Sequence, residues 1–173
     1  FTYYPLGIII KENEGFCQGE NILIGNSATI TNNHLEAFKV ISQLKLENRK
    51  VIVPLNYGDR NYARAINTKG NLNFGVNFYP LLDFLPLSEY QKILNTCGIV
   101  IMNHYRQQAV GNVLNTLYMG SKVFLSEKNT LFHYLKRIGC VVYSIERDLS
   151  FNNSSIFILL TKEQQILNRR ILK

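Results

Sequence analysis

The sequence predicts an open α/β fold, with a parallel sheet that is covered by helices on both faces. Short, continuous apolar runs recur from about residue 20 onward, and segments with apolar residues at helical spacing lie between them. A strand that is apolar along its whole length is typical of a sheet buried on both sides. Capping residues and glycines mark where the helices start and stop. Strands and helices that alternate in this way indicate parallel crossover units.

The first strand–helix–strand unit is predicted close to the start of this pattern. Residues 21–25 form the first strand, which reads Asn-Ile-Leu-Ile-Gly. Asn33, with Glu36 three residues later, resembles a capping box and should start the first helix. Residues 50–55 follow as the second buried strand.

The middle of the chain should continue the alternation. A helix after the second strand is expected to stop at Gly70. A strand is expected at residues 76–79, and Ser88 should cap the helix that follows it. Residues 98–102 are the next apolar run, so they should form a central strand of the sheet.

The last third of the chain repeats the pattern twice more. Strands are predicted at residues 122–125 and 140–145. Asn129 should cap the helix between them, and Gly139 should end it. Thr161 should start a terminal helix.

One domain is the default for a chain of 173 residues, which is long enough to bury a core. Residues 1–20 do not fit the alternation and are expected to be a linker or inter-domain segment, with the domain at residues 21–173. The chain begins without an initiator methionine or a signal-peptide pattern, so we expect a fragment of a longer protein. No apolar run approaches the ~20 residues that span a bilayer.

The charge balance favours anionic partners. The 19 basic and 12 acidic residues give a net charge of +7, which suits a nucleotide diphosphate, nucleic acid or an acidic membrane surface. The basic residues are dispersed, apart from Arg169 and Arg170, and no nucleic-acid-binding motif is present. We therefore expect no nucleic-acid partner.

The cysteines and histidines predict neither disulfides nor a metal centre. Cys17, Cys97 and Cys140 form no C-x-x-C motif, and the last two lie beside predicted buried strands, where cysteine acts as a small apolar residue. A chain without a disulfide framework is typical of the cytosol. The histidines lack metal-ligand spacing, so no cofactor or metal is expected.

The richest polar turn of the chain follows the strand at residues 98–102. Ligands of open α/β sheets bind beyond the carboxyl ends of the strands, and this turn opens a helix whose free N–H groups and positive end favour an anion. The turn therefore predicts a phosphate site, with a solvated helix start as the alternative. The candidate ligands are Arg106, Gln107, Gln108, Gly111 and Asn112.

A second polar turn, Gly25, Asn26 and Ser27, follows the first strand. Such small residues let hydrogen-bond donors approach a phosphate closely. The turn matches neither G-x-G-x-x-G nor a P-loop, which disfavours nicotinamide cofactors and Walker-type ATP hydrolysis. An ordinary helix cap is the alternative.

Four further side chains could contact a nucleoside or sugar. Tyr57 could stack on a base, or could simply belong to a turn. His104 could orient a phosphate or carry a proton, although a lone histidine is more often structural. Glu127 and Asn129 could hold sugar hydroxyls, whereas the alternative for Glu127 is to complement the helix dipole. Because no nucleophile elbow is present, these residues predict a binding half without catalytic residues.

Taken together, these segments resemble one glycosyltransferase family. It contains the fucosaminyltransferase (4-alpha-L-fucosyltransferase) that adds N-acetylfucosamine from a dTDP donor to lipid-linked precursors of enterobacterial common antigen. Its most specific element is the Arg-Gln-Gln at residues 106–108 with the following Gly111. The resemblance covers roughly residues 20–148 and rests on residues 24–27, 51–54, 57–58, 106–112 and 126–129.

This resemblance implies the Rossmann-like, C-terminal donor-binding half of a GT-B glycosyltransferase. It implies a metal-independent, inverting transfer of a deoxyamino sugar from a nucleotide diphosphate to a lipid-linked acceptor. The enzyme would be peripheral on the inner face of the bacterial cytoplasmic membrane, an anionic surface. An N-terminal domain of the same protein would supply the acceptor site and the base, so the isolated chain would not turn over. Leu135 breaks the two-glutamate pattern of retaining enzymes, which agrees with inversion.

The resemblance also assigns roles to the polar turns. Gly25, Asn26, Ser27 and residues 106–112 would lie at the donor diphosphate. Tyr57, His104, Glu127 and Asn129 would lie near the nucleoside and sugar.

Two alternatives come from other functional classes. The first is a non-catalytic domain that docks on an anionic membrane or a partner protein through its positive surface. The second is another enzyme on the same fold, such as a nucleotide-sugar epimerase, because a fold does not fix the chemistry.

Overall fold

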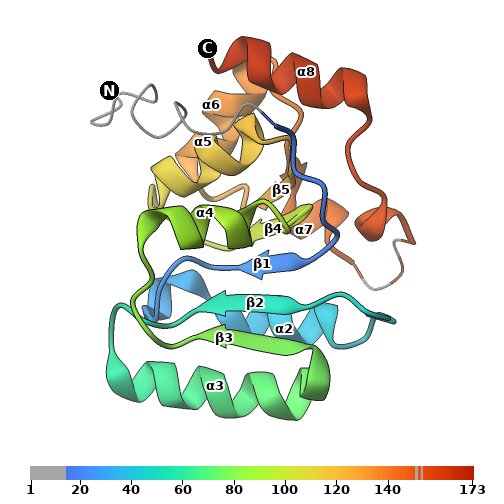
Figure 1. Cartoon of the computed structure of the whole chain (residues 1–173). Helices are drawn as coiled ribbons and strands as arrows, with labels where there is room; N and C mark the ends of the chain where they lie inside the picture. Colours follow the sequence, from blue (N-terminus) through green and yellow to red (C-terminus); the bar gives the residue numbers. More distant parts are fainter. Residues whose placement is uncertain (1–14, 151, 153) are drawn as a thin grey trace.

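A six-stranded sheet, in which every strand pair is parallel, forms the centre of the protein (Figure 1). The computed structural model describes residues 15–150, 152 and 154–173. Across the sheet the strand order is β3-β2-β1-β4-β5-β6. The strands are β1 (Ile22–Ile24), β2 (Val51–Pro54), β3 (Phe78–Leu81), β4 (Ile99–Met102), β5 (Lys122–Leu125) and β6 (Tyr143–Ser144).

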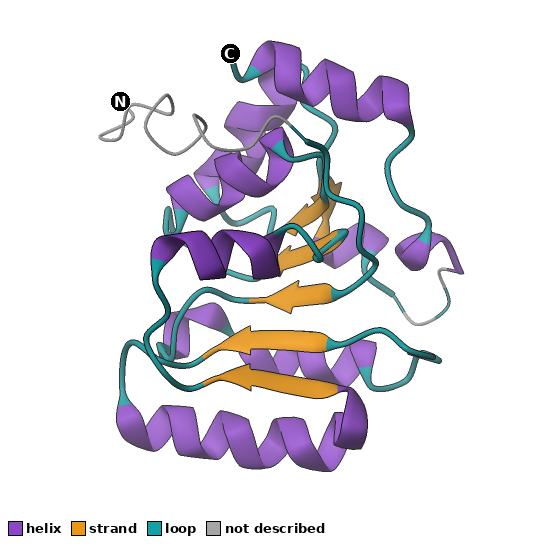
Figure 2. Cartoon of the chain, in the orientation of Figure 1, coloured by secondary structure: helices purple, strands orange, loops and turns teal. Residues whose placement is uncertain are grey.

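Helices cover both faces of this sheet, as predicted (Figure 2). One apolar core joins β1, β4 and β5 to the helices α4, α5 and α6, and a second core joins the other face to α2 and α3. The open parallel α/β fold is thereby confirmed. The α-helices are α2 (His34–Ile41), α3 (Arg60–Phe74), α4 (Leu87–Leu94), α5 (Val110–Tyr118), α6 (Thr130–Arg137), α7 (Ile145–Asp148) and α8 (Lys162–Ile171).

Four predicted strands, β1, β2, β4 and β5, match the observed ones to within one residue at each end. The other two differ. β3 starts two residues later than predicted, because a 3-10 turn, Gly75–Asn77, precedes it. β6 is shorter than predicted, because the Asn168 side chain hydrogen-bonds both the N–H and the carbonyl of Val141, at 2.7 and 3.1 Å. A side chain of α8 thus replaces the strand ladder there.

Two predicted helix caps differ from the observed ones. α2 begins directly after Asn33, as predicted, but the predicted capping box does not form. Asn33 precedes α2 with a φ of 48° and its side chain caps nothing; its amide instead donates to the carbonyl oxygen of Asn103 at 2.8 Å. The Glu36 carboxylate accepts hydrogen bonds from the side chains of Asn103 and Tyr105, so it does not complete a capping box. Ser88 lies inside α4, which begins one residue earlier.

The predicted stop of α3 at Gly70 is also wrong. The helix continues through this residue and is ended by Gly75, which has a φ of 51°. A Cβ on Gly70 would lie 2.1 Å from the Phe78 ring. Gly70 therefore lets β3 pack directly against the helix.

The remaining predicted caps are confirmed. The Asn129 side chain accepts from the Leu131 N–H at 3.0 Å, and Thr161 forms a full capping box with Gln164. Gly139 follows α6 with a φ of 90°, as a helix stop requires.

Two peripheral parts of the domain are the edge strand β3 and the stretch that precedes β1. β3 forms one edge of the sheet and contains Pro80. Of the predicted linker, residues 1–14 lie outside the described residues. Cys17, in the described part, donates its N–H to the Met119 carbonyl at 2.6 Å, so this stretch packs on the end of α5. Cys17, Cys97 and Cys140 are all buried and unpaired.

Candidate functional site

The polar turns predicted from the sequence lie at the carboxyl end of the sheet. β1 pairs with β4, although β2 and β3 lie between them in the sequence. The strand order therefore reverses at this pair, and such switch points are where open α/β sheets bind ligands. The turns after β1 and β4 meet there.

The turn after β1 depends on a glycine. Gly25 has a φ of 70°, and a Cβ there would lie 2.5 Å from His34 Nε2. The next residue, Asn26, is partly exposed and donates its N–H to Asn32 Oδ1 at 2.9 Å. Ser27 is buried, and its carbonyl accepts from Asn32 Nδ2 at 2.9 Å. Asn26 is thus the side chain of this turn that can reach a ligand.

Two buried histidines lie behind the turn. Asn32 Nδ2 donates to carbonyls, so its Oδ1 accepts, and the 2.8 Å contact to His104 Nε2 places the His104 proton on that nitrogen. Burial, with the nearby Arg106 charge, lowers the pKa of His104 to about 4. Burial, with His104, lowers the pKa of His34 to about 4. Both imidazoles are therefore neutral at pH 7.

His104 had been predicted at the nucleoside, but its side chain is fully buried and supports the turn from beneath. Its Nδ1 and the Nε2 of His34 are buried without a hydrogen-bond partner among the described residues. The polar surface in front of them is supplied by other side chains.

The turn after β4 exposes the first two residues of the Arg-Gln-Gln motif. Within the described part of the chain, the side chains of Arg106 and Gln107 are exposed and have no hydrogen-bond partner. The third, Gln108, is half-buried and bonded to the turn after β1. α5 then begins at Val110, with no side chain capping it, so its first-turn N–H groups are unsatisfied within the helix.

Gly111 and Asn112 lie in this first turn of α5, and both are partly exposed. Asn112 lines a cavity of about 250 Å³ together with Asn26 of the turn after β1. The structure thus brings together two of the residues predicted at the diphosphate, Asn26 and Asn112, around one cavity. The other residues that line this cavity are Pro54, Asn56, Leu81, Phe84, Leu85, Leu87 and Tyr90.

The predicted residues after β5 are engaged within the protein. Asn129 is fully buried; its amide donates to the carbonyl oxygens of His104 and Arg106 at 3.1 and 2.9 Å. It therefore fixes the turn that carries Arg106. Glu127 forms an ion pair with Arg147.

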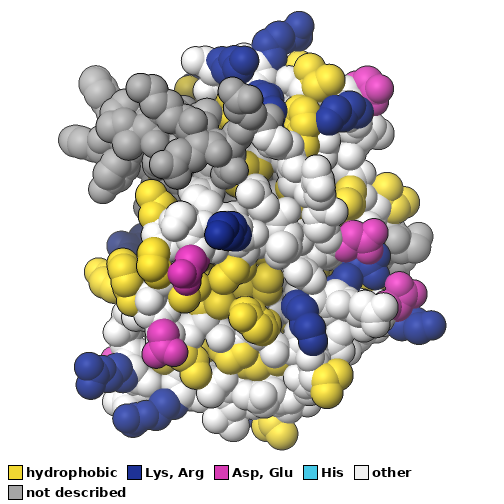
Figure 3. All heavy atoms as spheres, viewed as in Figure 1, with side chains coloured by type: hydrophobic (Ala, Val, Ile, Leu, Met, Phe, Trp, Pro, Cys, Tyr) yellow, Lys and Arg dark blue, Asp and Glu magenta, His cyan; other side chains and the backbone are white. Residues whose placement is uncertain are grey.

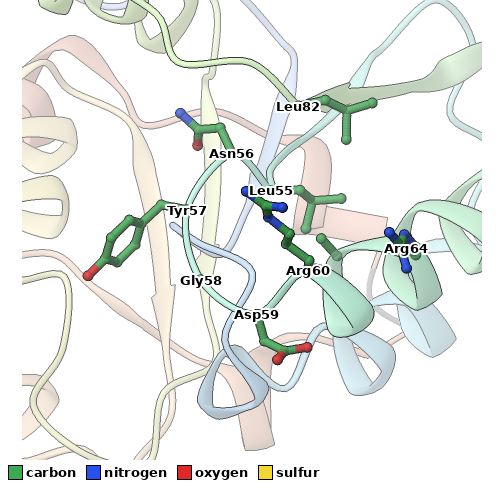
Figure 4. Close-up of a pocket in the computed structure, with 9 residues that line it drawn as sticks. Leu55, Asn56, Tyr57, Gly58, Asp59, Arg60, Arg64 and Leu82 are labelled. Atoms are coloured by element: carbon green, nitrogen blue, oxygen red, sulfur yellow. The ribbon is translucent and has the colours of Figure 1, made fainter.

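Tyr57 follows β2 beside a larger hollow of about 640 Å³ (Figure 4). Its side chain is 76% exposed, and in Figure 4 the ring points away from Arg60 and Arg64. Asn56 lines both this hollow and the smaller cavity. Asn56 directly follows a predicted strand, so the rule that selected the other turns could have found it.

Phe84 was missed for a different reason. It lies in the turn after β3 and is 87% exposed. The sequence placed that strand two residues too early, so this turn was not recognised as part of the ligand edge.

Neither a metal-binding cluster nor a membrane-spanning helix is found in the described part of the chain. Among the described residues, no three His, Cys, Asp or Glu side chains gather where they could hold a metal ion. No helix in the same part of the chain is long and apolar enough to cross a membrane. On the face seen in Figure 3, Lys and Arg side chains lie at several separate places.

Two solved structures resemble this protein in fold. AviGT4, a glycosyltransferase involved in avilamycin A biosynthesis, matches with a TM-score of 0.52 and 14% identity over 90% of this chain and 42% of its own. The N-terminal domain of Candida albicans trehalose-6-phosphate phosphatase matches with a TM-score of 0.57 and 16% identity, over 96% of this chain and 38% of its own. At these identities the likeness concerns the fold, and this chain spans less than half the length of either.

A comparison with protein families is more specific than the likeness in fold. The family described as "4-alpha-L-fucosyltransferase glycosyl transferase group 56" matches residues 7–166. The resemblance predicted from the polar turns is thereby confirmed, as is the Rossmann-like fold of one half of a GT-B glycosyltransferase. This chain belongs to the 4-alpha-L-fucosyltransferase family, glycosyl transferase group 56.

Proposed function

We propose that this chain is the donor-binding half of its glycosyltransferase and holds the donor diphosphate where β1 meets β4. The observation that carries the proposal is the exposed Arg106 guanidinium, which has no partner among the described residues and precedes the uncapped start of α5. A guanidinium, free N–H groups and the positive end of a helix together suit two linked phosphates. Gln107, Asn26 and Asn112 supply further amide donors, and Gly25 and Gly111 leave room beside them.

The rest of the donor would extend from this point along the carboxyl edge. The cavity between Asn26 and Asn112 has an apolar wall formed by Leu81, Phe84 and Leu87, which suits the flat ring of a base. Tyr57 offers a second exposed ring. In this proposal the donor is a dTDP-linked deoxyamino sugar similar to N-acetylfucosamine. Glu127 would contact it after exchanging its ion pair with Arg147 for sugar hydroxyls.

The reaction would be an inverting transfer to a lipid-linked acceptor at the cytoplasmic face of the membrane, without a metal. As the bond to the sugar breaks, negative charge grows on the leaving diphosphate, and Arg106 and the α5 N–H groups would stabilise it. The acceptor hydroxyl must lose its proton to a base. We assign that base to an N-terminal domain, so the 173-residue chain would bind the donor weakly and transfer no sugar.

Calorimetric titration of the chain with dTDP, UDP and GDP tests this function. We expect binding of dTDP, and a dissociation constant at least about tenfold higher for Arg106→Ala combined with Gln107→Ala, since charge-assisted hydrogen bonds to phosphate are lost. Arg170→Ala, on α8, is the matched control and should bind as the parent does. Failure to bind any of the three nucleotides would refute the proposal. An unchanged affinity in the double variant would refute the placement of the diphosphate.

A further inference from the structure

Gln108 joins the two turns that meet at the switch point. Its Oε1 accepts a hydrogen bond from the Thr31 hydroxyl at 2.7 Å. Its Nε2 donates to Asn26 Oδ1 and to Thr29 Oγ1, both at 3.3 Å. One side chain from the turn after β4 therefore uses both ends of its amide on the turn after β1.

Asn32 holds the same turn from the inside. It is fully buried, and its Nδ2 contacts the Ser27 carbonyl and the Thr29 hydroxyl at 2.9 and 2.8 Å. Its Oδ1 accepts from the Asn26 N–H and from His104. The turn after β1 is thus fixed from below by Asn32 and from the side by Gln108, and Asn26 lies between the two.

The contacts of Asn26 determine which end of its amide faces outward. Its Oδ1 accepts from Gln108 Nε2, and within the described chain its Nδ2 has no hydrogen-bond partner. An amide whose oxygen is occupied in this way presents its NH₂ group to a ligand. That group is a donor, which is what an anion requires.

From this geometry we infer that Gln108 is a positioning residue for the donor site and does not itself contact the donor. It ties the turn of Asn26 to the turn of Arg106 and turns the NH₂ of Asn26 toward the ligand. Gln107, its neighbour, is exposed and unbonded within the described chain, so two adjacent glutamines have different tasks. The inference rests on the proposed function, because it concerns how the diphosphate site is organised before the donor binds.

Thr31 allows a test that separates positioning from direct contact with the donor. Its hydroxyl donates a hydrogen bond to Gln108 from the opposite turn, and Thr31 itself is not among the residues proposed to contact the donor. Calorimetry with dTDP should be performed on Thr31→Val, Gln108→Ala and the double variant. We expect each single change to raise the dissociation constant about three- to tenfold, the range that one net hydrogen bond spans. The double variant should be no weaker than the weaker single variant, since both changes break the same link.

Two additional variants sharpen the result. Thr31→Ser keeps the hydroxyl and should restore the parent affinity, whereas a purely steric effect would persist. Gln108→Glu replaces the NH₂ that binds Asn26 by an acceptor, so the Asn26 amide should turn over and the affinity should fall further than in Gln108→Ala. Thr68→Val, on the exposed side of α3, is the matched control for Thr31→Val. Urea unfolding of every variant shows that it is folded.

The outcomes distinguish the two proposals. If the parent chain binds no nucleotide, the proposed function fails and this inference fails with it. If dTDP binds but Thr31→Val leaves the affinity unchanged, the positioning role alone is refuted. Effects of Thr31→Val and Gln108→Ala that add independently would assign Gln108 a direct contact with the donor instead.

Discussion

Acidification between pH 7.5 and 5.5 should destabilise this protein, because two neutral histidines are buried in its centre. Burial lowers the pKa of His34 and of His104 from 6.5 to about 4. The unfolded chain, with ordinary histidines, takes up protons below pH 6.5, and the folded chain does not. The stability that these two histidines contribute is therefore fully present above pH 6.5, falls as the pH is lowered, and levels off below about pH 4.

The magnitude follows from the two pKa values. At pH 5.5 an unfolded histidine of pKa 6.5 gains about 1.4 kcal/mol from protonation, while a folded one of pKa near 4 gains almost nothing. The two histidines together should remove about 3 kcal/mol, compared with a typical total stability of about 5–15 kcal/mol. Since both lie behind the turns that carry Asn26 and Arg106, nucleotide affinity should decline over the same interval.

Urea unfolding at pH 7.5, 6.5 and 5.5 measures this loss directly. His104→Gln should retain only about 1.4 kcal/mol of the pH-dependent loss, whatever its absolute stability, because one of the two sites is gone. His133→Gln removes an exposed histidine of α6 and should retain the full loss. A parent protein equally stable at pH 7.5 and 5.5, or a His104→Gln variant as pH-dependent as the parent, would refute the reasoning.

Two further predictions concern packing. Gly70→Ala should lower the free energy of unfolding by about 1–3 kcal/mol, because the new Cβ would lie 2.1 Å from the Phe78 ring, although alanine favours helices. Gly15→Ala is the control, since a Cβ there meets open space. A Gly70→Ala variant that urea unfolding shows to be more stable than the parent would contradict the packing argument. Lys122→Met should also lower the free energy of unfolding by about 1–3 kcal/mol, because the buried ammonium donates to two backbone carbonyls that would lose their partner. Lys69→Met, at an exposed position, should leave the stability unchanged. Equal stability of the two variants in thermal unfolding would show that the carbonyls find other donors.

Four of the six strands, β1, β2, β4 and β5, were predictable because each lies in a continuous, buried and mainly apolar run. Errors arose where a side chain from elsewhere competes with the local pattern. Asn168 takes the backbone of Val141 out of the last strand, and Asn103 engages Asn33 in place of a cap. Gly70 was expected to end a helix because glycine often does so. Its actual role, to make room for the Phe78 ring, depends on a contact that only the folded chain reveals. The contacts of Asn168 and Asn33 join residues that are distant in sequence, so no local sequence periodicity reveals them.

The turns that form the site were predictable from the sequence, but which of their side chains are exposed was not. The rule that ligands lie beyond the strand ends selected the turns after β1 and β4 correctly as neighbours. It could not tell which polar side chains face outward, because a turn that must hold an anion also needs internal hydrogen bonds. Asn129 and His104 lie inside for this reason, whereas Arg106, in the same turn as His104, lies outside. That distinction depends on burial, which only the folded chain reveals.

The edge strand β3 bears on how this protein behaves when it is concentrated. The Leu81 carbonyl accepts from the Leu55 N–H at 2.8 Å and so points toward β2. Because the backbone groups of successive residues point to opposite sides along a strand, those of Phe78 and Pro80 point away from β2, toward the open edge of the sheet. The Phe78 N–H already donates to the Gly75 carbonyl, and Pro80 has no N–H. An incoming strand would therefore meet no amide donor along the outer rim of β3. Two molecules that meet at this edge lack the donors for a regular hydrogen-bond ladder between their sheets, which disfavours fibrous self-association.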